Sequence, residues 1–224
     1  SDKNVEWKYC YGGSAADFAV KVLQTSDGGY LIGAYSSSND QQVMNQHGGS
    51  DFWLLKLDVN GMIQWSKCFG GSGDERLFSL TVTPEGDYLA AGSSTSDDFD
   101  VIGNIGAAIG SWFIKVSPTG DLIWQQCCVG INSERATDII VQGNNYYVSG
   151  VDQSSYRSFL LQLDTSGLHL NYRLMPWFDV YISSITSLGS DGLLLGGIID
   201  SAFMGILGDY DCFIAKVDTA FNIQ

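Results

Sequence analysis

Short apolar runs alternate with polar turns along the whole 224-residue chain. Residues 62–69, 76–83, 88–94 and 111–117 form one such series, and β-branched and aromatic residues recur within each run. The turns GGSGDE and PEGD and a long polar loop separate the runs. Runs of about 5–8 residues bounded by Gly, Asp, Asn and Ser are typical of β-strands, and helix-length periodicity is absent. The pattern therefore predicts an all-β chain.

The series is repeated along the chain. Trp7, Trp65 and Trp124 are 58 and 59 residues apart, each begins the same order of elements, and Tyr172 takes that place 48 residues later. Four short strands per unit at this period are typical of a β-propeller, because one sheet buries its faces only by stacking on its neighbours. We expect each Trp to anchor a junction between blades.

We predict one β-propeller domain over residues 1–224, with four blades of four antiparallel strands each. The repeats lie at approximately 5–62, 63–121, 122–169 and 170–224. The alternative is a fragment of a larger propeller; a two-sheet sandwich would leave the period unexplained. The chain is expected to be a monomer.

Charge narrows the range of partners. The chain has 25 acidic and 11 basic residues, which gives a net charge of −14. Such a surface repels phosphate backbones and anionic lipid, so nucleic acid and membrane surfaces are not expected partners. No run approaches the roughly 20 apolar residues of a membrane helix, so we expect no transmembrane segment.

The repeat W-x-K-x-[YF]-G-G-S-x-x-[DE], followed by T-x-D-G-G-Y, resembles one seen in secreted and lipoprotein-anchored β-propeller proteins of Bacteroidetes. The resemblance covers most of the chain and weakens in the fourth unit, where RLMPWFDV lacks the Gly-Gly pair. It implies a propeller fold and an extracellular, cell-surface or periplasmic location. It carries over no catalytic residue. The match is carried by Trp7, Gly12, Gly13, Ser14, Asp17, Thr25, Asp27, Gly28, Gly29, Tyr30, Trp65, Lys67, Gly70, Gly71, Ser72 and Glu75.

Two sets of side chains recur at repeat-equivalent places. Asp17, Glu75, Glu134 and Asp179 follow the first strand of each unit, and they predict either a carboxylate ring that binds a cation or a sugar, or acids that cap tight turns. Cys10, Cys68, Cys127 and Met175 lie three residues after each anchor. They would form either a soft-metal site across a central channel or small packing residues.

The long loops carry the remaining candidates. Asp98, Asp100 and Asn104 could bind Ca²⁺ through hard oxygen ligands, although a solvated loop explains them as well. No other cofactor is expected. Loops 36–50, 94–110 and 199–210 differ between units and bring His47, Phe99 and Tyr210 to one face.

No Ser–His–Asp set, HExxH motif or paired histidines are present in the sequence. Variable loops on a repeated scaffold favour a non-enzymatic, exported module that binds a protein or a glycan. The alternatives are a polysaccharide-acting hydrolase or lyase that uses Asp17 and Glu75, and a structural spacer.

Overall fold

The computed structural model describes residues 4–104, 109–128, 134–200 and 210–224, and it confirms the all-β prediction. Apart from strands, the described residues form one short 3-10 helix, Gly189–Asp191. The strands are β1 (Asp17–Gln24), β2 (Tyr30–Ser36), β3 (Asp51–Leu57), β4 (Ile63–Phe69), β5 (Glu75–Val82), β6 (Tyr88–Ser94), β7 (Gly110–Val116), β8 (Leu122–Cys128), β9 (Glu134–Gln142), β10 (Asn145–Asp152), β11 (Arg157–Asp164), β12 (His169–Phe178), β13 (Val180–Ser187), β14 (Leu193–Asp200) and β15 (Tyr210–Val217).

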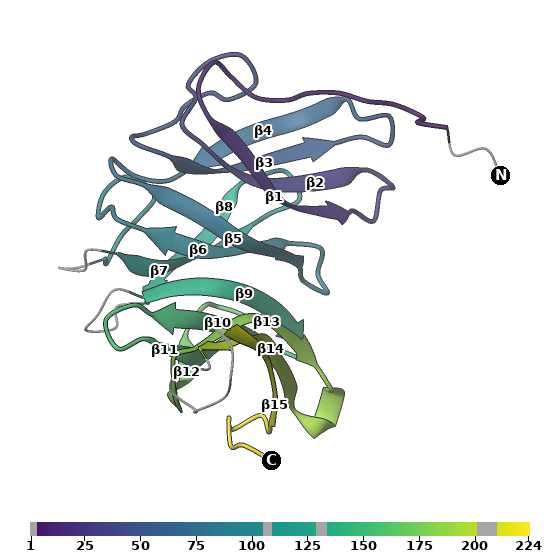
Figure 1. Cartoon of the computed structure of the whole chain (residues 1–224). Coiled ribbons are helices and arrows are strands. Elements are labelled where there is room, and N and C mark those ends of the chain that lie inside the picture. Colours follow the sequence, from purple (N-terminus) through teal and green to yellow (C-terminus); the bar gives the residue numbers. More distant parts are fainter. Residues whose placement is uncertain (1–3, 105–108, 129–133, 201–209) are drawn as a thin grey trace.

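The strands form four antiparallel sheets, and each sheet follows the order of the chain (Figure 1). The first three sheets are β1–β4, β5–β8 and β9–β12. The fourth differs from the prediction, since the described residues give it only three strands, β13–β15. Beyond β15, Ile223 forms a single bridge with Val217.

The sheets are out of phase with the sequence repeats by one strand. The strands that carry the repeat tryptophans Trp65 and Trp124, β4 and β8, each end a sheet. In the first sheet a tight turn folds β4 back on β3: Gly61 N donates to Asp58 O at 3.1 Å, and Asp58 N to Met62 O at 2.9 Å. The Gly-Gly-Ser turn that follows carries the chain into the next sheet. The sequence shows both turns but not which one joins paired strands.

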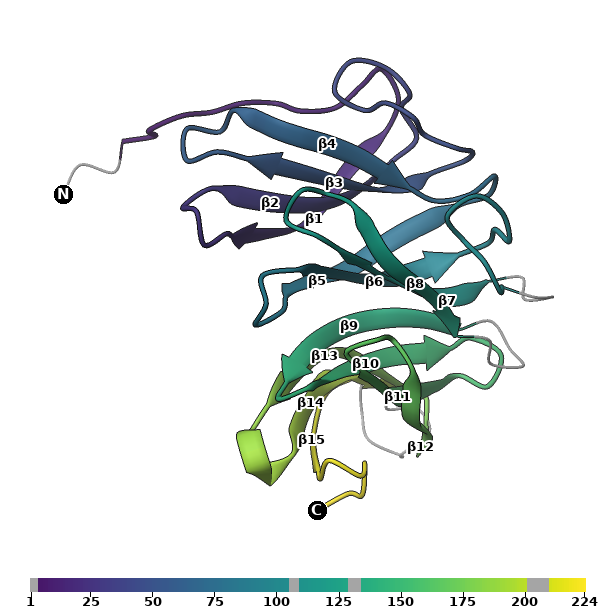
Figure 2. The same ribbon diagram turned by 180° about the vertical axis from the view of Figure 1, so that it is seen from behind.

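The four sheets are arranged in sequence order, with the first at one end and the fourth at the other (Figures 1 and 2). The first strand of each sheet packs on the first strand of the next, β1 on β5, β5 on β9 and β9 on β13. Asp138 on β9 links three of them, because it accepts hydrogen bonds from Ser79 Oγ on β5 at 2.7 Å and from Ile185 N on β13 at 2.9 Å. Apolar cores fill the three joints between sheets.

The tryptophans anchor these joints, as the repeat predicts. Trp65 at the end of the first sheet donates from Nε1 to Pro118 O in a turn of the second, at 3.0 Å. Trp124 donates in the same way to Thr165 O of the third sheet, at 3.2 Å. In the third sheet the prediction is wrong by one residue, because Asn171 pairs with Gln162 where Trp65 pairs with Lys56.

The predicted thiol ring across a channel is wrong. Cys68 and Cys127 lie on β4 and β8, the last strands of their sheets, and they are buried in two different apolar cores. Burial raises the pKa of each thiol to about 12, so both stay protonated. Met175 packs in the joint with the fourth sheet. Leu174, not Met175, occupies the strand position of the third sheet that Cys68 occupies in the first. The packing interpretation therefore describes these residues.

Candidate functional site

The long loops of the first two sheets meet at one end of the stack. The imidazole of His47, from the loop between β2 and β3, packs on the ring of Phe99, from the loop between β6 and β7, with centroids 5.1 Å apart. The backbone of Phe99 has a φ of 53°, which is uncommon for a residue with a bulky side chain. Two residues that the sequence assigned to a binding face are thus in direct contact.

The Gly70–Asp74 turn contacts both loops: Gly49 N of the first loop donates to Gly73 O at 2.7 Å, and N–H groups of the turn donate to acids of the second loop. Gly71 N donates to Glu75 Oε2 at 2.7 Å, Ser72 N to Asp98 Oδ1 at 2.7 Å, and Gly70 N to Asp100 Oδ2 at 3.3 Å. The glycine at 71 is needed for this approach, because a Cβ there would lie 2.4 Å from the Cβ of Ser96. These acids therefore satisfy the N–H groups of the turn, Glu75 from a buried position and Asp98 and Asp100 from partly exposed ones.

The first sheet repeats the arrangement. Gly13 N donates to Asp17 Oδ2 at 2.8 Å, Ser14 N to Asp40 Oδ1 at 2.7 Å, and Gly12 N to Gln42 Oε1 at 3.1 Å. Ser36 Oγ also donates to Asp17 Oδ1. The turn-capping interpretation of Asp17 and Glu75 therefore describes their contacts in the structure.

The other two acids of the predicted ring have separate surroundings. Glu134 is buried and accepts a hydrogen bond from Tyr172 Oη at 2.8 Å. Asp179 lies between β12 and β13 with a φ of 55°. Strand register shows that Val180, not Asp179, is equivalent to Asp17, since Val180 pairs with Ile199 where Asp17 pairs with Ser36.

Asp51 is the acid that the sequence reasoning missed. It begins β3, its side chain is fully buried, and its Oδ2 accepts hydrogen bonds from His47 Nδ1 at 2.8 Å and His47 N at 3.0 Å. Its Oδ1 has no hydrogen-bond partner within the described residues. Burial is the main cause that raises the pKa of Asp51 to about 6, and the charge of Glu75 adds to it. The signal was an acid that opens an otherwise apolar strand, DFWLL.

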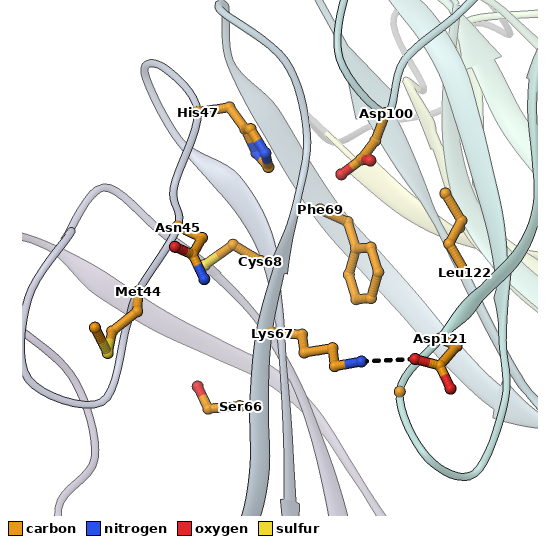
Figure 3. Close-up of a pocket in the computed structure, with 11 residues that line it drawn as sticks. Met44, Asn45, His47, Ser66, Lys67, Cys68, Phe69, Asp100, Asp121 and Leu122 are labelled. Atoms are coloured by element: carbon orange, nitrogen blue, oxygen red, sulfur yellow. Dashed lines mark hydrogen bonds and ion pairs between the residues drawn. The ribbon is translucent and has the colours of Figure 1, made fainter.

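Beside this cluster lies a pocket of about 410 Å³ (Figure 3). Met44 and His47 border it from the loop, Phe69 from β4 and Leu122 from β8. Lys67 crosses its floor toward Asp121, with 2.9 Å between Nζ and Oδ1. Polar and apolar side chains share the lining of the pocket, and Lys67, Asp100 and Asp121 are its charged groups.

The candidate calcium ligands form hydrogen bonds with the backbone of their own loop and of the neighbouring turn. Besides the bonds of Asp98 and Asp100 to the turn, Asn104 Nδ2 donates to Ser94 O at 3.2 Å and Ser96 O at 2.9 Å. Hydrogen bonds from Ser72 lower the pKa of Asp98. Among the residues whose positions are described, no group of three or more His, Cys, Asp or Glu is placed to hold a metal ion.

Tyr210 is not part of this site. It begins β15 in the fourth sheet and is exposed there. Residues 105–108 and 201–209, which belong to the second and third predicted loops, lie outside the described residues. The structure therefore brings together the loops of the first two sheets, and the binding face predicted on them stays a prediction.

No helix in the described part of the chain is long and apolar enough to cross a membrane.

No protein-family model matches the chain, and no curated protein matches it in sequence. Solved structures do match. A protein of unknown function from Bacteroides caccae is 13% identical with a TM-score of 0.55, over 95% of this chain and 68% of that one. One from Dyadobacter fermentans, also of unknown function, is 11% identical with a TM-score of 0.56, over 90% of this chain and 60% of that one.

The GH43_1 enzyme from Xanthomonas citri, solved with xylotriose, is 11% identical with a TM-score of 0.52, over 91% of this chain and 70% of that one. At such identities the likeness concerns the fold alone. The chain is an all-β protein of four antiparallel sheets that matches propeller proteins over most of its length.

Proposed function

We propose that the surface made by residues 43–47 and 97–102, called here the loop surface, binds a protein partner that presents apolar and basic side chains. The observation that carries the proposal is a set of exposed apolar side chains on ordered loops beside a pocket. Met44, Phe99 and Ile102 are 62%, 63% and 66% exposed. Large apolar groups left in water and surrounded by polar ones are typical of interaction surfaces.

Charge supports a basic partner. Asp98, Asp100 and Asp121 lie on or beside the loop surface, and the whole chain has a net charge of −14. An acidic rim around an apolar centre steers and orients a partner of opposite charge. The loops are fixed by the Gly70–Asp74 turn, so binding requires little ordering of the site.

A display library of random peptides tests the proposal, with the wild-type chain and a Met44→Ser/Phe99→Ser variant as baits. We expect the wild type to enrich peptides rich in Arg, Lys and apolar residues, and the variant to bind them at least about tenfold more weakly. Val82→Ser is the matched control, because Val82 is also exposed but lies at the opposite end of β5 from the loops. Equal binding by all three proteins would contradict the proposal.

The same three proteins on a glycan array separate the remaining possibilities. Binding of glycans that is lost in the loop variant would replace the protein partner by a glycan. A structural spacer predicts that the loop variant changes neither binding profile. The resemblance of the repeat to secreted and lipoprotein-anchored proteins supports a role outside the cytoplasm, and we include that location in the proposal.

The second candidate is an enzyme that acts on polysaccharide. It is favoured by the likeness to the GH43 structures and by the raised pKa of Asp51 beside Glu75. Against it, both carboxylates are fully buried beneath the Gly-Gly turn and do not reach a substrate. We therefore expect no release of xylose from xylotriose; release that Glu75→Gln abolishes would support the enzyme.

A further inference from the structure

Two arginines line a second pocket, which lies between the second and third sheets. Arg76 and Arg135 are near the start of β5 and β9, the first strands of those sheets, and the two strands pack on each other. The pocket has a volume of about 220 Å³. It shares no lining residue with the pocket of Figure 3, so it is a separate site.

The fold does not require arginine at these places. Strand register puts Arg76 and Arg135 at one equivalent position of the first strands. The first sheet has Phe18 at this position, and the fourth sheet has Tyr181. The ring of Phe18 stacks on that of Tyr35, with centroids 5.0 Å apart. An aromatic side chain therefore suffices for packing there, and the two positive charges occur only in the two sheets that form the pocket.

The protein does not neutralise these two charges. The ion pairs of the described residues include neither Arg76 nor Arg135, although the chain has 25 acidic and only 11 basic residues. Arg135 Nε is buried and has no hydrogen-bond partner within the described part of the chain. A buried donor on a charged group is costly when no acceptor meets it. An anion in the pocket would supply the missing charge and acceptor.

Phe78 orients one of the two guanidinium groups. A bulge in β5 between Leu77 and Ser79 leaves Phe78 without a partner on β6, and such bulges redirect side chains beside binding sites. Arg135 Cζ lies 4.9 Å from the centroid of the Phe78 ring. A guanidinium held over a ring loses little freedom when it binds, and its fork of N–H groups matches the two oxygens of a carboxylate.

The rest of the lining indicates a small, hydroxylated ligand. Ser93 contributes a hydroxyl group and Gln153 an amide, and both groups can bond to the hydroxyls of a ligand. Asp74 also lines the pocket, so its acidic and basic groups leave one positive charge in excess. The volume is smaller than the roughly 300–1,000 Å³ of sites for drug-sized molecules, and it suits a single ring with one negative charge.

We propose that this pocket binds a sugar acid, that is, one sugar ring that carries one carboxylate. The guanidinium groups of Arg76 and Arg135 bind the carboxylate, and Ser93 and Gln153 bind hydroxyls of the ring. The net charge of −14 repels ligands with many negative charges, which disfavours nucleic acids and strongly acidic peptides in the same pocket.

Calorimetric titration with sodium glucuronate tests the proposal, with glucose as the neutral analogue. We expect saturable binding of glucuronate and at least tenfold weaker binding of glucose, which lacks the carboxylate. Arg76→Gln should weaken glucuronate binding at least about tenfold, and Arg76 is exposed, so the change does not endanger the fold. Lys21→Gln is the matched control, because it removes one positive charge from an exposed place on β1. Absence of glucuronate binding, equal binding of glucose, or equal affinities of the two variants overturns the proposal.

Two further ligands and one further variant separate a built site from a general attraction of anions. Sodium acetate and inorganic phosphate should each bind at least about tenfold more weakly than glucuronate. Arg135→Lys keeps the charge but loses the planar fork, so it should weaken glucuronate binding at least about fivefold. Acetate or phosphate that binds as tightly as glucuronate, or an Arg135→Lys variant that binds like the wild type, overturns the proposal.

The outcome is independent of the protein partner proposed for the loop surface. The Met44→Ser/Phe99→Ser variant leaves every lining residue of this pocket in place, so it should bind glucuronate with the affinity of the wild type. Loss of glucuronate binding in that variant would overturn the assignment to this pocket, whereas loss of peptide binding alone would not affect it.

Discussion

The joint between the first and second sheets and the outer face of the fourth sheet use the same strand positions, but only the joint is closed. Leu54 fills the joint, while Ile214 in the same register is left in water. The repeat therefore places an apolar residue at this strand position in both sheets, although within the described residues only Leu54 is covered. Hydrophobicity in a repeated sequence shows which faces can be buried, and the order of sheets decides which are.

The largest expected difference is in the free energy of unfolding, between an alanine substitution in a closed joint and one at the equivalent position of the exposed first sheet. Leu80→Ala should lower the free energy of unfolding by about 3–5 kcal/mol, because it leaves a cavity between two sheets. Val22→Ala should change it by less than about 0.5 kcal/mol. Urea unfolding at concentrations where the chain is monomeric measures both, with an unchanged m-value as the control. Equal losses would mean that the first sheet is covered in solution.

The turn-capping acids give the next comparison. Glu75 is fully buried and its Oε1 accepts from Ser94 Oγ at 2.6 Å and from Ser96 Oγ at 2.8 Å, in addition to the bond from Gly71. Glu75→Ala should cost about 3 kcal/mol, because it leaves these donors buried without an acceptor. Asp17→Ala, nearer to solvent, should cost about 1 kcal/mol. If Asp17→Ala proved the more costly, the two turns would not be equivalent.

The periodicity of the sequence was sufficient for the strands, the blade joints and the meeting of the first two loops. Alternation marks strands because side chains face opposite sides of a sheet in turn. Trp65 and Trp124 marked the joints because a large apolar ring recurs only where each unit needs it. The first two loops met as expected because equivalent loops of stacked sheets leave at the same end.

Two features could not be predicted from the sequence: at which strand each sheet begins, and the register of the last strand of the third sheet. A turn of glycine and serine connects paired strands or successive sheets equally well, so the position of β4 was ambiguous. In the third sheet a one-residue shift puts Asn171, and not the expected Tyr172, at the position that Trp65 holds in the first sheet, and such a shift exchanges the two faces of a strand. Asp51 was missed because it lies outside the repeat that drew attention to the other acids.

Asp51 distinguishes the first joint by its response to pH. Its pKa of about 6 in the folded chain lies above the ordinary aspartic acid value of 3.8, so the folded state holds its proton more tightly than the unfolded state. Its contribution to stability is therefore full below about pH 4 and is lost as pH rises from about 4 to about 6, by about 3 kcal/mol in all. Asp51→Asn should remove this slope in unfolding free energy measured from pH 4 to 8. An unchanged slope would assign it to another group.

The Lys67–Asp121 ion pair across the first joint should matter least. Its side chains are 38% and 71% exposed, so solvent and salt screen the charges. The aliphatic part of the Lys67 side chain should contribute more to stability than the charge. It packs on Gly120, where an added Cβ would lie 3.1 Å from Lys67 Cδ and Cε. Lys67→Met should therefore stay within about 0.5 kcal/mol of the wild type, and Lys67→Ala should lose about 1 kcal/mol by thermal or urea unfolding. Equal losses for both variants, removed by high salt, would show instead that the charge holds the joint.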